Sequence, residues 1–402
     1  MSKKILILDG NSSQCLPLMR SFYKGGHWVT LVCPSKLCSG YFSRYANKRI
    51  VWCTVTGNEE QYYQQLLEHV KVEKYDLVLG LSDASSALLA SHKSEIEQYV
   101  QTTVPDYPIY SVAADKYLTM KLCMEHNIPC PVSYAVDELE DDDYKMNLKF
   151  PLVLKPRKGV GAVGFTILED QESLFEQLPE LKEKHGKLLI QEYIPNKKQF
   201  TVEAFCDENS DLKACVVSEK TRFFPVSGGT SSCNFLVDHP AVVLIVEKLL
   251  KTLNWVGVAN IDFVFDPRDG MPKVIEINPR IGATAKIAFM AGIDLAKMLL
   301  SLAEGKKLAK YSSHEEDIVM RNLLLDVLWF LFSSWEQKRI TYPGFSQFFG
   351  RKVHYQSFRM DDPAPLIGFI LGYIMKYANL DLLNKKLGVQ TNSKLKSKVK
   401  TS

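Results

Sequence analysis

The segment NIDFVFDPRDGMPKVIEINPR, residues 260–280, predicts a β-hairpin whose strands each have one apolar and one polar face. Six residues alternate with the apolar ones and are assigned to the polar face: Asn260, Asp262, Val264, Val274, Glu276 and Asn278. Pairing Phe265 with Lys273 across the turn would set Asp262 directly opposite Glu276. Two carboxylates so placed repel each other, whereas a hard cation such as Mg2+ binds both. The hairpin therefore predicts either a metal site or a solvated outer face.

The composition indicates a soluble globular protein with more than one domain. Its 402 residues suggest two or three domains, and 46% hydrophobic and 24% charged residues are ordinary values. A net charge of +3 gives no reason to expect nucleic acid as a partner. Nine cysteines without a Cys-x-x-Cys pair fit neither a zinc site nor a disulfide framework. The first residues enter a strand pattern rather than a signal peptide, so we expect a cytoplasmic protein.

The sequence pattern changes twice along the chain. Strand and helix patterns alternate up to about residue 111, which predicts a parallel sheet of Rossmann-like layout. The first turn, DGNSSQ, lacks a GxGxxG motif and is not expected to bind a dinucleotide. From residue 150 to about residue 302, hairpins and mixed strands are indicated. The last hundred residues hold two apolar segments, Ile318–Phe332 and Leu366–Tyr377, and a lysine-rich tail from Lys385.

The two apolar C-terminal segments are shorter than the roughly 18 to 20 residues that a helix needs to cross a bilayer. We expect them to be buried helices. Attachment of this region to a membrane surface, helped by the basic tail, is the less favoured alternative.

A glycine loop follows a predicted strand at residues 150–168, FPLVLKPRKGVGAVGFTIL. Formally it contains a GxGxxG motif, but a dinucleotide motif must open a helix, and Gly164 is followed by the strand-like FTIL. The loop is therefore predicted to be a hairpin tip, where Gly159, Gly161 and Gly164 let backbone N–H groups approach phosphate oxygens. Lys155, just before it, would reach the same oxygens. A flexible surface hairpin with an exposed lysine is the alternative.

The segment KLLIQEYI, residues 187–194, predicts an apolar strand that ends before a proline. Backbone groups at such a strand end can bind the edge of an adenine ring. The candidate residues there are Gln191, Glu192, Tyr193 and Ile194, and Gln199 in the next strand is a candidate ribose contact. Taken alone, Gln199 is more simply a surface glutamine.

Taken in order, these motifs resemble those of the ATP-grasp superfamily over about residues 111–302. They are Lys116 in ADKYLTMK, Lys155 with its glycine loop, QEYI, Asp262 in NIDF, and EINPR. The N-terminal KILILDGNSSQCLPLMRSF, with FSRY at Phe42, is similar to the predicted ATP-dependent carboligase group that includes D-aspartate ligase. DDPAPL at Asp361 also resembles that group. The resemblance thus extends, less strongly, over most of the chain.

The resemblance implies a fold of mixed class, α/β and α+β, in three units. Residues 1–112 would be a Rossmann-like domain with a parallel sheet, preceding the ATP-grasp fold. Residues 113–310 would be a two-lobed ATP-grasp domain with mixed and antiparallel sheets, including a lid subdomain at about 125–190. Residues 311–402 would be a mainly helical extension with a basic tail.

The resemblance also implies roles for the candidate residues, with ATP and Mg2+ or Mn2+ as cofactors. Phosphates would be held by Lys116 and Lys155, under a lid formed by residues 159–164. Adenine would be held by backbone groups of Glu192 and Ile194. The metal would be held by Asp262, which stands where a glutamate is common, and by Glu276 and Asn278. Arg280 would neutralise the charge that develops on the transferred phosphoryl group.

The implied reaction activates a carboxylate as an acyl-phosphate, from which an amine displaces phosphate. Lys220, Arg222 and the glycines Gly228 and Gly229 in VSGGTSS are candidates for the acceptor pocket, and a flexible loop is the equal alternative. We therefore predict a carboxylate–amine ligase acting on small molecules, which could form a homodimer. The alternatives are activation of bicarbonate, as in carbamoyl phosphate synthetase or biotin carboxylase, and an ATP-binding module without turnover.

Overall fold

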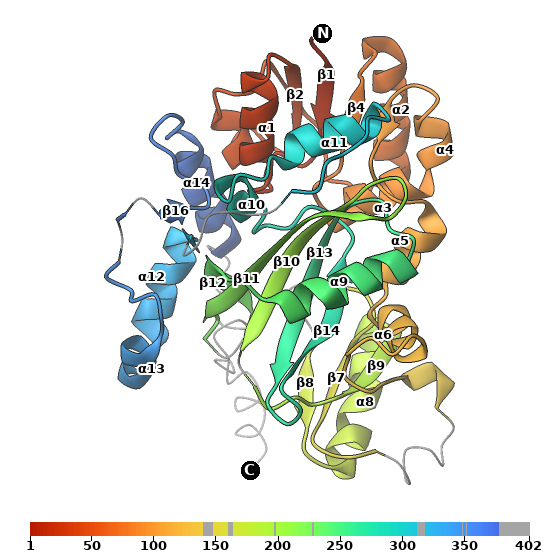
Figure 1. Ribbon diagram of the computed structural model, residues 1–402, viewed down its shortest axis with the longest axis vertical. Coiled ribbons are helices and arrows are strands. Elements are labelled where there is room, and N and C mark those ends of the chain that lie inside the picture. Colours follow the sequence, from red (N-terminus) through yellow and green to blue (C-terminus); the bar gives the residue numbers. More distant parts are fainter. Residues whose placement is uncertain are drawn as a thin grey trace, which may run out of the picture.

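The computed structural model describes residues 1–139, 148–159, 164–196, 198–226, 229–311, 318–347, 349–350 and 352–377. In these residues the chain forms three β-sheets with helices against their faces (Figure 1). The N-terminal sheet lies at the top of the view, the central sheet below it, and a smaller sheet at the bottom, beside α8.

The N-terminal sheet is parallel throughout, with strand order β3-β2-β1-β4-β5. Its strands are β1 (Lys4–Ile7), β2 (Trp28–Cys33), β3 (Lys48–Val51), β4 (Leu77–Leu79) and β5 (Gln101–Thr102). The helices that follow them are α1 (Cys15–Lys24), α2 (Glu59–Glu73), α3 (Asp83–Ser91), α4 (Lys93–Ile96) and α5 (Tyr107–Ala114). Helices on both faces explain why residues 5–8 are all apolar and fully buried. The predicted Rossmann-like layout is confirmed.

The small sheet is antiparallel, with strand order β6-β9-β7-β8. Its strands are β6 (Ser133–Ala135), β7 (Leu152–Pro156), β8 (Thr166–Leu168) and β9 (Leu188–Glu192). They are accompanied by α6 (Lys116–Glu125) and α8 (Gln171–His185). Because β7 pairs with β8 across the glycine loop, that loop connects the strands of a hairpin, as predicted. Gly161 lies outside the described residues.

The central sheet has the strand order β14-β13-β10-β11-β12-β15-β16. Its strands are β10 (Gln199–Cys206), β11 (Leu212–Phe224), β12 (Thr230–Leu236), β13 (Gly257–Asp266), β14 (Met271–Asn278), β15 (Val319–Arg321) and β16 (Val353–Tyr355). All neighbours pair antiparallel except β15 and β16. Helix α9 (Pro240–Thr252) covers one face, and its buried side chains join the core that lies under the sheet. The opposite face of β10 and β13 is therefore free to carry polar side chains.

The C-terminal region is helical in part, but it also completes the central sheet. Its helices are α10 (Lys286–Met290), α11 (Leu295–Ala303), α12 (Leu323–Phe332), α13 (Trp335–Ile340) and α14 (Pro365–Tyr377). The prediction of one helix over Ile318–Phe332 is wrong at its start, where Val319–Arg321 is strand β15. Asn322 explains the boundary, because its side chain accepts a hydrogen bond from Leu325 N and caps α12. Within the described residues, no helix is long and apolar enough to span a membrane.

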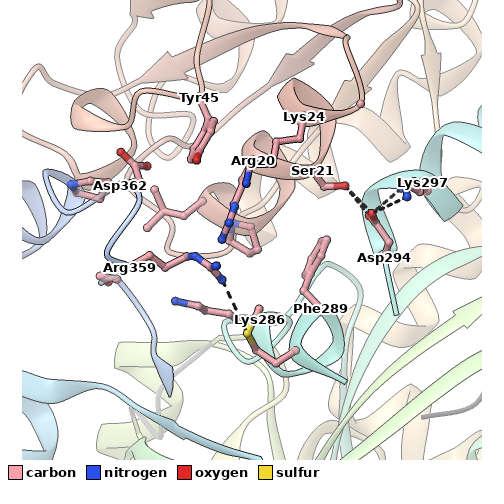
Figure 2. Close-up of a pocket in the computed structure, with 16 residues that line it drawn as sticks. Arg20, Ser21, Lys24, Tyr45, Lys286, Phe289, Asp294, Lys297, Arg359 and Asp362 are labelled. Carbon is pink, nitrogen blue, oxygen red and sulfur yellow. Dashed lines mark hydrogen bonds and ion pairs between the residues drawn. The ribbon is translucent and has the colours of Figure 1, made fainter. Parts of the chain in front are cut away.

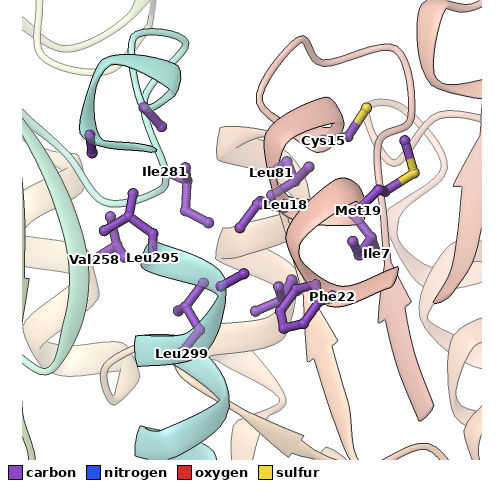
Figure 3. Packing of buried hydrophobic residues seen from close by; sticks show 14 of the residues in the cluster. Ile7, Cys15, Leu18, Met19, Phe22, Leu81, Val258, Ile281, Leu295 and Leu299 are labelled. Carbon is purple, nitrogen blue, oxygen red and sulfur yellow. The ribbon is translucent and has the colours of Figure 1, made fainter. Parts of the chain in front are cut away.

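One hydrophobic core joins the N-terminal sheet to the later part of the chain. Figure 3 shows Leu18 and Phe22 of α1 facing Leu295 and Leu299 of α11. Ile281, just after β14, packs in the same cluster. This packing fixes the loop that follows the candidate metal-binding strand against the N-terminal sheet.

Candidate active site

The β13–β14 hairpin places Asp262 directly opposite Glu276, as the sequence predicted. The pairing nearer the turn differs from the prediction, since Phe265 pairs with Pro272 and not with Lys273. The reason is a β-bulge at Ile275, which shifts the register by one residue between the carboxylates and the turn.

The bulge also changes the face on which Val274 lies. The prediction put Val274 on the polar face, but the structure buries it completely in the core, paired with Phe263. An extra residue in one strand reverses the alternation beyond it. Val274 thus packs with Phe263 and Ile277, while Glu276 stays on the polar face.

Two lysines lie against the two carboxylates. Lys220 Nζ is 2.8 Å from Asp262 Oδ2, and Lys116 Nζ is 3.1 Å from Glu276 Oε2. Burial alone would raise the pKa of Glu276, but the ammonium groups of Lys116, Lys155 and Lys220 hold it below its ordinary value. The carboxylate is therefore ionised at neutral pH. Lys220 and Lys116 come from opposite sides of the hairpin, one from β11 and one from α6.

The donor set suits a hard divalent cation. The second oxygen of Asp262, Oδ1, is buried without a hydrogen-bond partner, and such an oxygen needs a ligand to offset its lost hydration. Asn278 Nδ2 donates to Asn260 Oδ1 at 3.2 Å, which turns the amide oxygen of Asn278 outward. No group of three or more His, Cys, Asp or Glu side chains suited to a metal occurs in the described residues. Two carboxylates and an amide, leaving positions for phosphate oxygens, are ligands of the kind that Mg2+ accepts.

Lys155 lies at the end of β7 beside this pair. Its Nζ donates to Gln191 Oε1 at 2.9 Å, and the Gln191 amide in turn donates to Ser133 Oγ at 2.8 Å. Burial lowers the pKa of Lys155 to about 8, against the opposing effect of Glu276. The buried side chain of Gln191 thus holds Lys155 in place, and an adenine contact by Gln191 stays a prediction.

The glycine loop is tied to the hairpin through Lys116. Lys116 Nζ donates to Gly159 O at 2.7 Å while it also contacts Glu276. Gly164 has a φ of 75°, and a Cβ there would lie 2.8 Å from Pro156 Cγ and 2.9 Å from His185 Nε2. Only glycine fits that position.

The candidate adenine residues lie where β9 ends. Glu192 is held by its side chain, with Oε1 2.6 Å from Arg268 Nη2, and its backbone N–H donates to Val132 O. Ile194 is buried and its carbonyl accepts from Asn196 N at 2.8 Å, whereas Tyr193 is half-buried. These bonds engage the N–H of Glu192 and the carbonyl of Ile194, and the adenine contact of this segment stays a prediction.

Gln199 belongs to the same polar face as the carboxylates. It pairs with Val264 of β13 and with Lys220 of β11, and Thr201 of β10 pairs with Asp262. Paired residues project from the same face of a sheet. Gln199 therefore lies two residues before Thr201 on β10, on the same face as Asp262. It is on the face along which the nucleotide would bind.

Glu203 is a residue of this face that the sequence analysis missed. It is buried, its Oε1 accepts from Gly282 N at 2.8 Å and its Oε2 from Asn260 Nδ2 at 3.2 Å. Burial raises the pKa of Glu203 to about 8. A Cβ at Gly282 would lie 2.5 Å from Glu203 Oε2, so the loop after β14 can approach only as glycine. The alternation of Gln199, Thr201 and Glu203 along this strand was the signal in the sequence that places Glu203 on the polar face.

Arg280 connects the site to the N-terminal sheet. Its Nε lies 3.0 Å from Asp83 Oδ1 at the start of α3, and its backbone N–H donates to Asn278 O at 2.7 Å. The guanidinium is mostly buried at this junction. Its Nη1 also donates to Ile281 O at 3.4 Å, and the N–H groups that remain are donors for an anion.

Arg222 does not line this face, which corrects the assignment of Arg222 to the acceptor pocket. Its side chain is fully buried, with Nε 2.5 Å from Asp326 Oδ1 and Nη2 2.9 Å from Oδ2. Arg321 Nε lies 2.6 Å from the same carboxylate. Gly229 has a φ of 150°, and a Cβ there would meet Phe224 O at 2.9 Å, so it serves the turn; Gly228 lies outside the described residues.

We expect Arg222→Gln to destabilise the fold without affecting nucleotide binding. Glutamine cannot make the two hydrogen bonds that Arg222 donates to the buried Asp326 carboxylate, and a buried charged acceptor that loses its donors costs about 3 kcal/mol. The free energy of unfolding in urea should fall by that amount, while the Kd for Mg-ADP measured by calorimetry should stay within two-fold. Arg339→Gln is the matched control, because Arg339 is exposed at the end of α13. Loss of nucleotide binding at full stability would instead return Arg222 to the site.

Comparisons with known proteins agree with this geometry. A sequence model of the ATP-grasp domain family matches residues 113–284. The D-aspartate ligase of Enterococcus faecium, strain Aus0004, is 26% identical over 249 residues, which cover 57% of this chain and 58% of that protein. The chain thus spans a little over half the length of this relative. A D-alanine–D-alanine ligase of Bacillus anthracis, strain CDC 684, is 27% identical over 62% of this chain and 90% of its own.

A solved structure supports the fold. The biotin carboxylase domain of Hydrogenobacter thermophilus 2-oxoglutarate carboxylase, crystallised with MgADP and bicarbonate, superposes with a TM-score of 0.67. The likeness covers 79% of this chain and 72% of that one, at 15% identity. Residues 113–284 of this chain thus match the ATP-grasp domain family in sequence, and the fold of the described residues is similar to that of the biotin carboxylase domain.

Proposed function

We propose that the protein is an ATP- and Mg2+-dependent carboxylate–amine ligase, with Mn2+ as the other metal that the site would accept. The observation that carries the proposal is the opposition of Asp262 and Glu276, each with a lysine partner, within an ATP-grasp domain. The relatives named D-aspartate ligase and D-alanine–D-alanine ligase support the reaction class. ADP release measured across a panel of carboxylates and amines tests it.

The residues of the site fit the parts of a phosphoryl transfer. Asp262, Glu276 and Asn278 would hold Mg2+, which when bound would neutralise phosphate charge. Lys155 and Lys116 reach the same region from the small sheet and from α6, and would hold phosphate oxygens. Phosphoryl transfer needs positioning and charge neutralisation more than a protein nucleophile. A carboxylate substrate would attack the γ-phosphate, and an amine would then displace phosphate from the acyl-phosphate.

Arg280 and the glycine loop would complete the site. Arg280 sits between Asn278 and Asp83, and its remaining N–H donors would stabilise the charge that develops on the transferred group. The loop from Gly159, already bonded to Lys116, would close over the phosphates and exclude water. Lys220, bonded to Asp262, would border the substrate on the β11 side.

Activation of bicarbonate is the second enzymatic candidate, and it is not favoured. The likeness to the biotin carboxylase domain is at 15% identity, which supports the fold alone. An ATP-binding module without turnover is disfavoured because a structural role does not require two opposed carboxylates.

Small-molecule acid and amine substrates are the partners that we propose, and a homodimer stays a prediction. Contact of the C-terminal region with a membrane surface also stays a prediction; exposed side chains such as Phe332 and Trp335 on α12 and α13 would make it. We keep boundaries near residues 112 and 310 as proposed domain limits. They mark changes of sheet rather than units that fold alone, since β15 and β16 belong to the central sheet.

Nucleotide affinity should depend on the charge of Lys155. Its pKa is about 8 in the free protein, so the ammonium form that binds phosphate is lost as the pH rises through that value. We expect the Kd for Mg-ATP to rise between pH 7 and pH 9, and binding near pH 8 to take up a proton, because a bound phosphate raises the pKa of Lys155. Calorimetry in buffers of different ionisation enthalpy measures the uptake.

Lys155→Ala should weaken Mg-ATP binding about ten-fold or more at pH 7, since a charge-assisted phosphate contact contributes roughly 1.5 to 3 kcal/mol. The variant should also lose the proton uptake near pH 8. Lys187→Ala is the matched control, because Lys187 is a mostly exposed lysine directly before β9 of the same sheet. Unchanged affinity in Lys155→Ala would place this lysine outside the nucleotide site.

A further inference from the structure

A second cavity lies away from the candidate active site. Its volume is about 390 Å³, and its walls come from α1, from α10 and from residues 357–365 (Figure 2). Among the described residues, none of the candidate nucleotide, metal or acceptor residues lines it. Cavities of 300 to 1,000 Å³ are the usual size for small-molecule sites.

The walls of the cavity are held together by the two motifs that the ATP-grasp site leaves unused. Ser43 Oγ of FSRY donates to Asp362 Oδ2 of DDPAPL at 2.6 Å, and Arg44 N donates to Asp362 Oδ1 at 3.1 Å. Tyr45 Oη donates to Asp361 Oδ2 at 3.1 Å. Ser43 and Asp362, which are 319 positions apart in the sequence, are thus held together in one wall of the cavity. The cavity is therefore defined by specific hydrogen bonds and is not a gap between loosely packed loops.

The cavity carries an excess of positive charge. Arg20, Lys24 and Arg359 share one carboxylate, Asp361; Arg20 pairs with its Oδ2, Lys24 lies 3.6 Å from the same atom, and Arg359 lies 3.1 Å from Oδ1. Figure 2 shows Arg20 entering from α1 and Arg359 from the C-terminal segment. Another pair, Asp294 and Lys297 at 3.6 Å, neutralises itself.

Lys286 adds a fourth cation. It is buried at the floor of the cavity, and its Nζ donates to backbone carbonyls, among them Phe358 O at 3.3 Å. Four basic side chains therefore face two carboxylates, Asp361 and Asp362, of which Asp362 is bound to Ser43 and Arg44 N. In the part of the chain that the structure describes, Arg359 Nη1 donates to the thioether of Met290, at 3.9 Å, which is a weak acceptor. A doubly charged anion would restore the balance.

The remaining wall is apolar. It consists of Leu16, Pro17, Phe289, Met290 and Pro365. An anion bound to the guanidinium groups would therefore have an apolar surface next to it, and a purely inorganic ion would leave that surface uncovered. Affinity in such a cavity comes from both halves, since guanidinium groups bind carboxylate and phosphate and the apolar wall buries hydrocarbon.

We propose that this cavity binds a small organic dianion with an apolar body, either a phosphate monoester or a dicarboxylic acid, as a ligand separate from the nucleotide. Arg20 and Arg359 hold the charged head, Lys24 and Lys286 border it, and Phe289 and Met290 contact the body. The cavity is lined by α1 of the N-terminal domain, by α10 and by residues 357–365. A ligand in it would therefore contact all three segments. The inference stands whether or not the protein proves to be a ligase.

The test is calorimetry of the full-length protein with phenyl phosphate and phenylsuccinate as probes. At least one should bind with a Kd below the millimolar range, and more tightly than inorganic phosphate or phenol. Arg359→Gln should weaken binding about ten-fold or more, as expected for loss of a charge-assisted contact. Saturating Mg-ADP and the Lys155→Ala substitution should leave it unchanged, because they affect the other site.

The variants separate the outcomes. Lys24→Gln, at a half-exposed position, should also weaken binding of the probes. This variant replaces Arg359→Gln in the test if Arg359→Gln does not fold. Arg339→Gln is the exposed control. Binding of the phosphate probe alone, or of the dicarboxylate alone, identifies the head group. Binding that competes with Mg-ADP, binding that survives both variants, inorganic phosphate binding as tightly as the probes, or no binding at millimolar concentration overturns the proposal.

Discussion

Glu276→Gln is expected to lower ADP release roughly a thousand-fold, the size of effect seen when a group aimed at transferred charge is removed. The amide keeps the shape of the side chain but loses the charge that a divalent cation needs opposite Asp262. Folding should change by less than about 1 kcal/mol, because loss of the ion pair with Lys116 is offset by loss of the repulsion between Glu276 and the opposing Asp262. ADP release at saturating Mg-ATP and urea unfolding measure the two effects.

Glu219→Gln is the control for this experiment. Glu219 lies on β11, where it pairs with Phe200 and Phe235 on the opposite face of the same sheet, and forms a partly exposed ion pair with Lys198 at 3.3 Å. Its substitution removes the same charge from the same sheet and should leave turnover unchanged. Near-normal ADP release from Glu276→Gln, or an equal loss in both variants, would rule out the metal assignment.

The sequence predicted the part of the site that depends on local pattern. Strand alternation puts Asp262 and Glu276 on the polar face, but their direct opposition depends on the register. The turn pairs Phe265 with Pro272, one residue away from the predicted pairing, and the bulge at Ile275 brings the two carboxylates back into opposition. The bulge at Ile275 could not be predicted, since no glycine or other local signal marks it. Because of the bulge, the predicted opposition of the carboxylates is confirmed, while the face of Val274 and the pairing near the turn differ from the prediction.

Residues that depend on distant contacts were missed or misplaced. Glu203 has its role through Asn260 and Gly282, which lie 57 and 79 positions away. The residues next to Arg222 in the sequence give no sign that it is buried. Its partner Asp326 lies 104 positions further along the chain. The alternation within a strand predicts on which face a side chain lies. It does not predict which residues from distant segments contact that side chain.

The fold shows the same division between local pattern and distant contacts. The parallel N-terminal sheet and the glycine hairpin follow from periodicity over many residues, and both are confirmed. Strands β15 and β16 have three residues each, and they join the central sheet only through partners far along the chain. Such short strands give no usable periodic signal, so the C-terminal region was expected to be mainly helical.

The reaction intermediate gives the largest contrast between the candidate functions. If a carboxylate attacks the γ-phosphate of ATP, an acyl-phosphate and ADP are formed in equal amounts. Hydroxylamine then attacks the acyl carbon, releases phosphate and forms a hydroxamate in place of the natural amide. Hydroxamate should therefore accumulate in proportion to ADP when the right acid is present, and should be absent without it.

The dependence of hydroxamate on the protein connects this result to the site. It should require Mg2+ and should fall with ADP in Glu276→Gln, since both products come from one transfer. Bicarbonate activation would give ADP without an acid-derived hydroxamate, and an ATP-binding module would give neither product. ADP formed at full rate without an organic acid, and no hydroxamate from any acid in a broad panel, would contradict the ligase. The dianion cavity is unaffected by either result, because its probes report binding and not turnover.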